Sequence, residues 1–185
     1  MTRWFGWLRF PGWLVGPKLQ SLHAGPEFRI AEDIRFAYAP RTIELRSDAF
    51  RDGEPLAATD QSPPLDWRNV PPEAKKLVLV LEDVDVPFPR PLVHAIAYDI
   101  DPSATAIAAG ALDGTQVTMG YNGAGHQGYV APAPPPGHGP HRYYFTLLAI
   151  DFVPRFDQPP TRTRLLDAIS GRVLALGETR FTAER

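Results

Sequence analysis

The chain has 185 residues, a length that suits one domain or one domain with a tail. Its 44% hydrophobic and 22% charged residues exclude a wholly disordered chain, a coiled coil and a collagen-like repeat, and its 21 prolines argue against a mainly helical fold. The net charge of −2, without a dense basic run, argues against binding to nucleic acid. The absence of cysteine excludes disulfides, thiolate metal sites and cysteine nucleophiles.

Residues 1–23 are rich in aromatic and basic side chains, and three of the four tryptophans lie here: Trp4, Trp7 and Trp13. A signal peptide is not expected, because Arg9 and Pro11 interrupt the apolar stretch. The chain also has no run of about 20 apolar residues that could span a membrane. We therefore predict a cytoplasmic location, with the periplasm as the alternative.

Two interpretations of this segment stay open. In the first, it is an arm whose aromatic side chains cover an apolar patch, across a homodimer. In the second, residues 1–23 make a peripheral contact with a membrane surface, with aromatic side chains at the interface and basic ones toward anionic headgroups. Pro11 and Pro17 limit any continuous helix and favour the first interpretation. We divide the chain into an aromatic and basic arm, 1–26, and one domain, 27–185, and expect a homodimer.

The first half of the domain shows apolar-polar alternation and then a continuous apolar run. Two alternations within residues 27–51 predict half-buried strands, the first around Ile30, Ile34, Phe36 and Tyr38 and the second at Ile43 and Leu45. Residues 52–76 are rich in turn formers, and residues 77–81 form an apolar run typical of a buried central strand. Residues 92–100 predict a further strand.

The second half combines a long loop, a strand and a helical pattern. Residues 120–141 are rich in glycine and proline, and strands flank them, so we interpret them as a binding loop. Residues 142–152 predict the strongest strand. Residues 162–176 have helical period, capped at Thr161 or Thr163 and ended by Gly177, and residues 179–182 predict a last short strand. Strands followed by one late helix indicate a β-rich domain.

Several polar side chains could share one cleft. Asp83 and Asp85 lie two residues apart at the end of a strand and would point to one face, while His94 opens the next strand. His141 and Tyr143 also share a face. The remaining loop histidines are predicted to lie at the solvated surface: His126 and His138.

Three chemistries could use such a set, and spacing alone does not choose among them. Asp83, His94 and His141 could hold a divalent metal ion. A His–Asp pair could act as a general base in a hydrolase. Histidine and the tyrosine hydroxyl could instead donate hydrogen bonds to an anion such as phosphate. No nucleophile motif or cofactor motif is present.

Four motifs in order resemble the phosphatidylethanolamine-binding protein family, in particular its bacterial Raf kinase inhibitor-like branch. They are DQSPPLDW at 60–67, LVLEDVDVP at 79–87, VHAIAYDI at 93–100 and PPPGHGPHRYYFTLLAID at 134–151. The resemblance covers about residues 43–182. Two positions depart from the family's pattern: Val84 stands where a proline is usual, and Ala131 where a glycine is usual.

The resemblance implies a mainly β fold of two antiparallel sheets with a few peripheral helices, one of them near 162–176, and a cis peptide bond at Val86-Pro87. It implies a non-enzymatic binding module without a cofactor. Such a module would hold phosphate, a carboxylate or a phospholipid headgroup and modulate a kinase or protease. The implied ligand-binding residues are Asp83, Asp85, His94, Pro135, His141 and Tyr143, with Trp67 and Tyr129 nearby.

Overall fold

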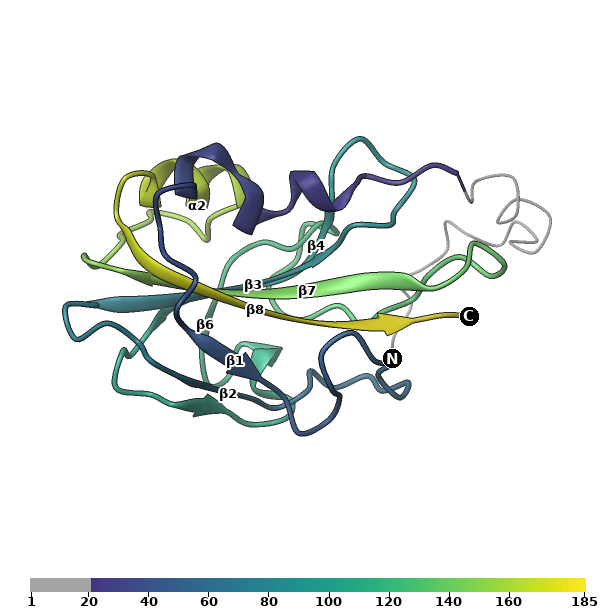
Figure 1. Ribbon diagram of the computed structural model, residues 1–185, viewed down its shortest axis with the longest axis horizontal. Helices are drawn as coiled ribbons and strands as arrows, with labels where there is room; N and C mark the ends of the chain where they lie inside the picture. Colours follow the sequence, from purple (N-terminus) through teal and green to yellow (C-terminus); the bar gives the residue numbers. More distant parts are fainter. Residues whose placement is uncertain (1–20) are drawn as a thin grey trace.

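The computed structural model describes residues 21–185, which fold into two antiparallel sheets with one α-helix (Figure 1). The larger sheet has the strand order β6-β4-β3-β7-β8, with bounds Thr118–Met119, Leu92–Ile100, Lys76–Asp83, His141–Ile150 and Val173–Ala183. The smaller sheet has the order β1-β2-β5, with bounds Glu44–Arg46, Leu65–Arg68 and Ala106–Ile107. The predicted mainly β fold with two antiparallel sheets is thus confirmed.

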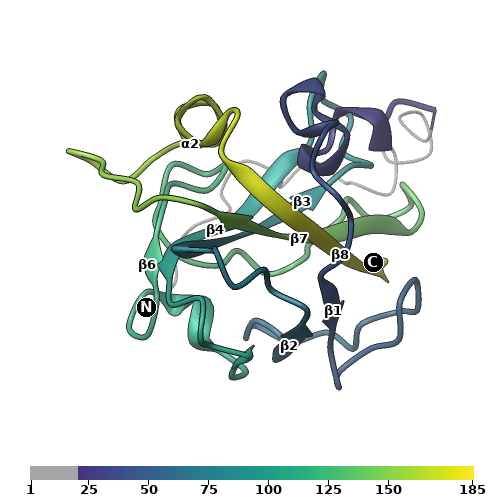
Figure 2. The ribbon, with the colours of Figure 1, turned by 60° about the vertical axis from the view of Figure 1, so that its left-hand side comes forward.

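Strand β3 lies at the centre of the larger sheet and is buried on both faces. Leu77, Leu79 and Leu81 point into the core between the two sheets. Val78 and Val80 point the other way, into a second core beneath helix α2, Arg162–Ile169. Figure 2 shows these layers, with α2 on one side of the larger sheet and the small sheet on the other. Because both faces of β3 are buried, its residues 77–81 form a continuous apolar run instead of an alternating pattern.

The first predicted strand, around residues 30–38, is wrong. This stretch forms three short 3-10 helices: η1 Pro26–Phe28, η2 Ile30–Glu32 and η3 Ile34–Phe36. Its backbone is held locally, because the Asp33 side chain accepts from the Arg35 amide, and across the fold, because the Ile30 amide donates to Glu82. A fourth such helix, η4, spans Ala111–Asp113. The second predicted strand is confirmed as β1.

The predicted helix over 162–176 is too long. Helix α2 begins after Thr161, whose side chain caps it as expected, and it ends at Ile169. Gly171, with φ of 74°, turns the chain into β8. Val173 and Leu176 belong to that strand but pack in the same core as the helix residues, which explains why the apolar pattern continues. Gly177 lies inside β8, where a Cβ atom would stand 2.2 Å from the Ile43 carbonyl oxygen.

The predicted cis bond at Val86-Pro87 is also wrong, because no described peptide bond is cis. The Val86 carbonyl accepts from the Ala24 amide at 2.9 Å, and the bond that follows it has the trans form that most X–Pro bonds adopt. Among residues 21–185, no helix has the length and apolar character needed to cross a bilayer.

Candidate functional site

The candidate site lies at one end of the larger sheet, where β3 ends and β7 begins. Asp83, the last residue of β3, stands opposite Tyr143 in the register with β7. His141 is the first residue of β7. Asp83 and His141 are both buried, and their side chains face the core between the sheets, as the two-residue spacing of His141 and Tyr143 predicts.

His94 reaches this face through an irregularity in β4. Leu81 pairs with Ala95 and Glu82 with Val93, so His94 is an extra residue in its strand, a β-bulge. Regular alternation from Ala95 would turn His94 toward α2. Because of the bulge, its ring instead packs edge-on against the Tyr143 ring, with centroids 5.1 Å apart.

A chain of three side chains runs through the buried site. The Asp83 carboxylate accepts from Nδ1 of His141 at 2.7 Å, and Nε2 of His141 lies 2.7 Å from Nδ1 of His138. His138 is buried, so its predicted place at the solvated surface is wrong. The turn that carries it explains this, since the His138 amide donates to the Pro135 carbonyl and folds the loop inward. Both ring nitrogens of His141 therefore have partners.

Asp85 does not join this group. Its carboxylate accepts three hydrogen bonds from Arg142: from Nε at 2.8 Å, from Nη2 at 2.6 Å and from the backbone amide at 2.7 Å. The chain turns directly after β3, because the Asp85 amide donates to Asp83, and alternation no longer applies. Burial acts to raise the pKa of Asp85, but the hydrogen bonds and charge of Arg142 prevail and hold the pKa below its ordinary value.

Three buried polar atoms of the site have no hydrogen-bond partner within residues 21–185: His94 Nε2, the Tyr143 hydroxyl and the Tyr129 hydroxyl. Nδ1 of His94 is already used, since it lies 2.8 Å from the Val130 carbonyl. Burial lowers the pKa of His94, against the opposing effects of that carbonyl and of Asp83. Burial, and next the charge of Asp83, raises the pKa of Tyr143, so its hydroxyl keeps its proton.

The other predicted site residues take varied places. The Tyr129 hydroxyl is buried, and burial and then the charge of Asp60 raise its pKa. Pro135 is half-buried in the loop that carries His138. Trp67 is a core residue of β2 whose indole donates to the Ala104 carbonyl. His126 is exposed, as predicted.

The described residues do not bring together three histidine or acidic side chains in an arrangement that could hold a metal ion. Asp83 and His141 are bonded to each other instead. A groove of about 450 Å³ lies beside the site, lined by residues 56–60, 130–134 and 183–185. Val130 links the two features, because its carbonyl accepts from His94 and the residue also lines the groove.

Comparison with known proteins identifies the family. The family model described as "Phosphatidylethanolamine-binding protein" matches residues 46–184. The chain belongs to this family. A UPF0098 protein of Chlamydia trachomatis is 37% identical over 153 residues, covering 77% of this chain and 99% of the relative. A UPF0098 protein of Methanothermobacter thermautotrophicus is 36% identical over 127 residues, covering 66% and 79%.

Solved structures of the family agree in fold. The crystal structure of a putative phosphatidylethanolamine-binding protein homologue from Chlamydia trachomatis matches with a TM-score of 0.71 and 37% identity, covering 77% of this chain and 97% of that one. An E. coli family member matches with a TM-score of 0.72 at 23% identity, covering 77% and 98%, which shows the shared fold. The family model leaves residues 1–45 unmatched.

Proposed function

We propose that the chain is a non-enzymatic binding protein that holds a small anion: phosphate, a carboxylate or a phospholipid headgroup. The observation that carries this proposal is the pair of buried, unpartnered atoms His94 Nε2 and Tyr143 Oη. A buried polar group without a partner costs about 1–3 kcal/mol, and a ligand that supplies the partner recovers that cost. The matched family model, by its description, favours a headgroup among these anions.

The chemistry of the two groups favours an anion. The Tyr143 hydroxyl can donate to a ligand oxygen. Because Nδ1 of His94 donates to Val130, its Nε2 is the atom that faces a ligand, and it either accepts from a protonated ligand or takes up a proton and donates to a charged one. Asp83 would repel an anion, but its two oxygens are already hydrogen-bonded to His141 and to the Asp85 amide.

A titration tests the proposal. Inorganic phosphate, acetate and phosphoethanolamine are added to the full chain, and the imidazole NMR signals of the histidines are followed. The His94 signal should shift saturably, while that of the exposed His126 should not. If only His126 or other exposed groups respond, the proposed site is not where the anion binds.

Two neighbouring tyrosines of β7 offer a matched pair of variants. Tyr143→Phe removes an unpartnered hydroxyl inside the site, whereas Tyr144→Phe removes one on the opposite face, where Tyr144 accepts from Arg180. A hydrogen bond to a charged group contributes about 1.5–3 kcal/mol, so Tyr143→Phe should weaken phosphate binding by roughly ten- to a hundredfold. Tyr144→Phe should leave it unchanged.

The bond between Asp83 and His141 favours a second candidate, a hydrolase with a His–Asp general base. The partner on Nε2 of His141 counts against it, because a base needs that nitrogen for the substrate. Turnover of phosphoesters by the full chain, abolished by His141→Ala in protein with a native circular dichroism spectrum, would establish the hydrolase. Anion binding without turnover supports the binding protein.

A further inference from the structure

The loop before β7 covers the candidate site. All three unpartnered atoms of the site are buried, so an anion can reach them only if part of the structure moves. Residues 129–140, which we call the cover loop, supply one of these atoms, the Tyr129 hydroxyl. Residues 130–134 of the same loop line the groove. The cover loop therefore forms the boundary between the site and the groove.

Histidines hold the cover loop at both ends. At its start, the Val130 amide donates to the His94 carbonyl at 2.9 Å, and the Val130 carbonyl lies 2.8 Å from Nδ1 of His94. At its end, Nδ1 of His138 lies 2.7 Å from Nε2 of His141, the first residue of β7. The loop is thus anchored to residues of the site itself.

The middle of the cover loop is held much less. Four of the six residues 131–136 are prolines, which have no amide hydrogen to donate. Within residues 21–185, no hydrogen bond reaches residues 131–134. The Gly137 amide donates to the Arg185 carbonyl at 3.3 Å, which is long for such a bond. The loop can therefore part from the site when one of its end anchors is released.

A histidine from the start of the described chain packs against the second anchor. The His23 ring lies edge-on to the His138 ring, with centroids 5.7 Å apart, and its Nδ1 lies 3.6 Å from Asp85. His138 also contacts the His141 ring, so it lies between a buried histidine and His23, whose side chain is 41% exposed. In Figure 1 the described chain begins at the same end of the molecule as the loop before β7.

The segment that carries His23, residues 21–41, is bound firmly to the larger sheet, and we call it the strap. Two backbone hydrogen bonds tie its start to the turn after β3. The Gly25 amide donates to the carbonyl of residue 84 at 3.0 Å, and the Ala24 amide donates to the carbonyl of residue 86 at 2.9 Å. Because these bonds directly follow His23, they restrict where its ring can lie.

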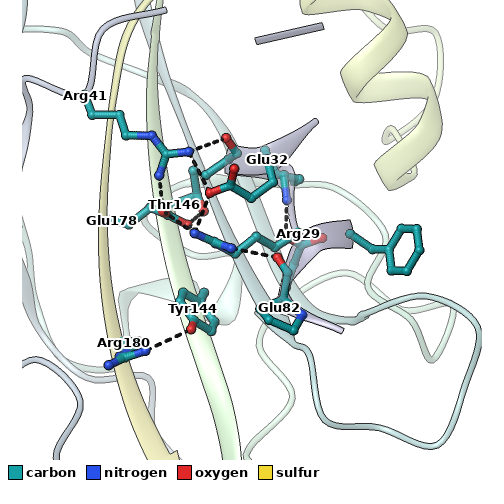
Figure 3. A network of polar contacts seen from close by, with 12 residues as sticks. Arg29, Glu32, Arg41, Glu82, Tyr144, Thr146, Glu178 and Arg180 are labelled. Atoms are coloured by element: carbon teal, nitrogen blue, oxygen red, sulfur yellow. Dashed lines mark hydrogen bonds and ion pairs between the residues drawn. The ribbon is translucent and has the colours of Figure 1, made fainter. Parts of the chain in front are cut away.

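A network of acidic and basic side chains anchors the rest of the strap, as Figure 3 shows. The buried carboxylate of Glu82 accepts from the Ile30 amide at 2.7 Å. Arg29 donates to Glu178 at 3.0 Å, and its guanidinium lies over the Tyr144 ring, 4.9 Å from the centroid. The strap therefore has a defined position on the domain.

We propose that the strap is a latch for the candidate site: by packing His23 against His138 it holds the cover loop closed, and an anion enters or leaves when this contact opens. The family model begins at residue 46, so the strap lies outside the matched region. The latch consists of residues 21–41 alone, and residues 1–20 of the predicted arm lie outside the described residues. Its effect on anion exchange rests on the proposed function, whereas closure of the loop can be measured without any anion.

Hydrogen exchange of the full chain, followed by NMR, tests the closure. The Gly137 and His138 amides report the cover loop, and the Leu147 amide, in the middle of β7, reports global unfolding. In His23→Ala the protection of the two loop amides should fall about three- to tenfold, the effect of losing an edge-on ring contact. Protection of Leu147 should not change, because His23 contributes no side chain to the core.

A matched pair of arginine variants tests the anchor of the strap. Arg29 in the strap and Arg172 before β8 each combine an ion pair with a position over an aromatic ring. Arg29→Met loosens the strap, so protection of the loop amides should fall about threefold or more. Arg172→Met removes the same kinds of contact elsewhere and should leave that protection unchanged. Unchanged loop protection in either His23→Ala or Arg29→Met overturns the proposal, as does a loss no greater than that of Leu147.

Anion exchange separates the latch from the proposed function. Sulfate is titrated into wild type and His23→Ala, and the line shape of the His94 signal gives the association and dissociation rate constants. Both should rise about three- to tenfold while Kd stays the same, because the contact opens for entry and for release alike. Looser closure without faster exchange would overturn the role in access. Absence of sulfate binding would contradict the proposed function instead, and hydrogen exchange would still decide whether the strap holds the loop closed.

Discussion

The carboxylate of Asp83 and Nδ1 of His141 lie 2.7 Å apart across the ends of β3 and β7, with both residues buried. A carboxylate accepts, so it fixes the proton of His141 on Nδ1 and leaves Nε2 toward His138. Asp83→Asn replaces an acceptor by a group that can present an amide donor. We expect His141 to change to the other tautomer, with its proton on Nε2.

The imidazole nitrogen chemical shifts of His141 report this change directly. A buried hydrogen bond to a charged group is lost, so the free energy of unfolding should fall by about 1.5–3 kcal/mol, measured by denaturant titration. Asp113→Asn, at an exposed carboxylate, serves as the control. An unchanged tautomer in the Asp83→Asn protein would contradict the assignment.

The proposed site predicts a pH-dependent affinity for sulfate, an anion whose charge stays constant near neutral pH. Burial lowers the pKa of His94 in the free protein, and a bound anion would raise it, so binding takes up a proton. Affinity should therefore rise as the pH falls through the pKa of the complex and level off below the pKa of the free protein. For one proton the slope reaches about tenfold per pH unit.

Calorimetry at several pH values measures this slope. Other histidines lie near the site, His23, His138 and His141, so the variant His94→Gln is needed to assign the effect. It should bind sulfate with little dependence on pH. A slope that persists in His94→Gln would assign the proton to another group.

Asp85 predicts part of the acid sensitivity of the fold. Its pKa lies below the ordinary value because Arg142 outweighs the effect of burial. A depressed pKa contributes stability that is fully present above the unfolded pKa and is lost as the pH falls through the folded one. Asp85→Asn should lower the free energy of unfolding at pH 7 by about 1–2 kcal/mol. When the pH falls below about 4, the variant should lose less of its remaining stability than wild type does. Denaturant titrations at both pH values check this, and parallel losses in the two proteins would refute it.

Gly177 predicts a steric effect inside β8. A Cβ atom there would lie 2.2 Å from the Ile43 carbonyl oxygen, so Gly177→Ala must push the segment before β1 away from the sheet. We expect a loss of about 3 kcal/mol in the free energy of unfolding. A Cβ atom at Gly171 would meet no atom within 4 Å. Gly171→Ala should therefore cost only the roughly 1 kcal/mol needed to hold an alanine in the left-handed backbone conformation. Equal losses in thermal or denaturant unfolding would contradict the close approach.

Some features of the fold could be predicted because they depend on local pattern. The apolar run at 77–81 predicts a central strand, and the spacing of His141 and Tyr143 places both on one face, because side chains alternate within a regular strand. The motifs that resemble the family supply the two-sheet fold, which the structure confirms.

Other features could not be predicted, because a strand and a helix can bury the same residues. Val173 and Leu176 fit the helical period of residues 162–169 and also pack in the same core from β8. Only the long pairing of β8 with β7 shows which conformation these residues adopt. Residues 30–36 show the same ambiguity: their apolar-polar alternation fits a strand, but they form 3-10 helices. Glu82, 52 positions along the chain, holds them there by accepting from the Ile30 amide.

The sequence by itself determined which polar side chains were candidates for the site, but the tertiary structure decided which of them meet. Asp83 and Asp85 look equivalent by spacing, yet the turn after β3 sends Asp85 to Arg142. His94 faces Tyr143 because of a bulge that exists only in the pairing of β4 with β3. Successive side chains alternate between the two faces only within a regular strand. Bulges in the pairing between strands and turns at strand ends interrupt this alternation, and both depend on the tertiary structure.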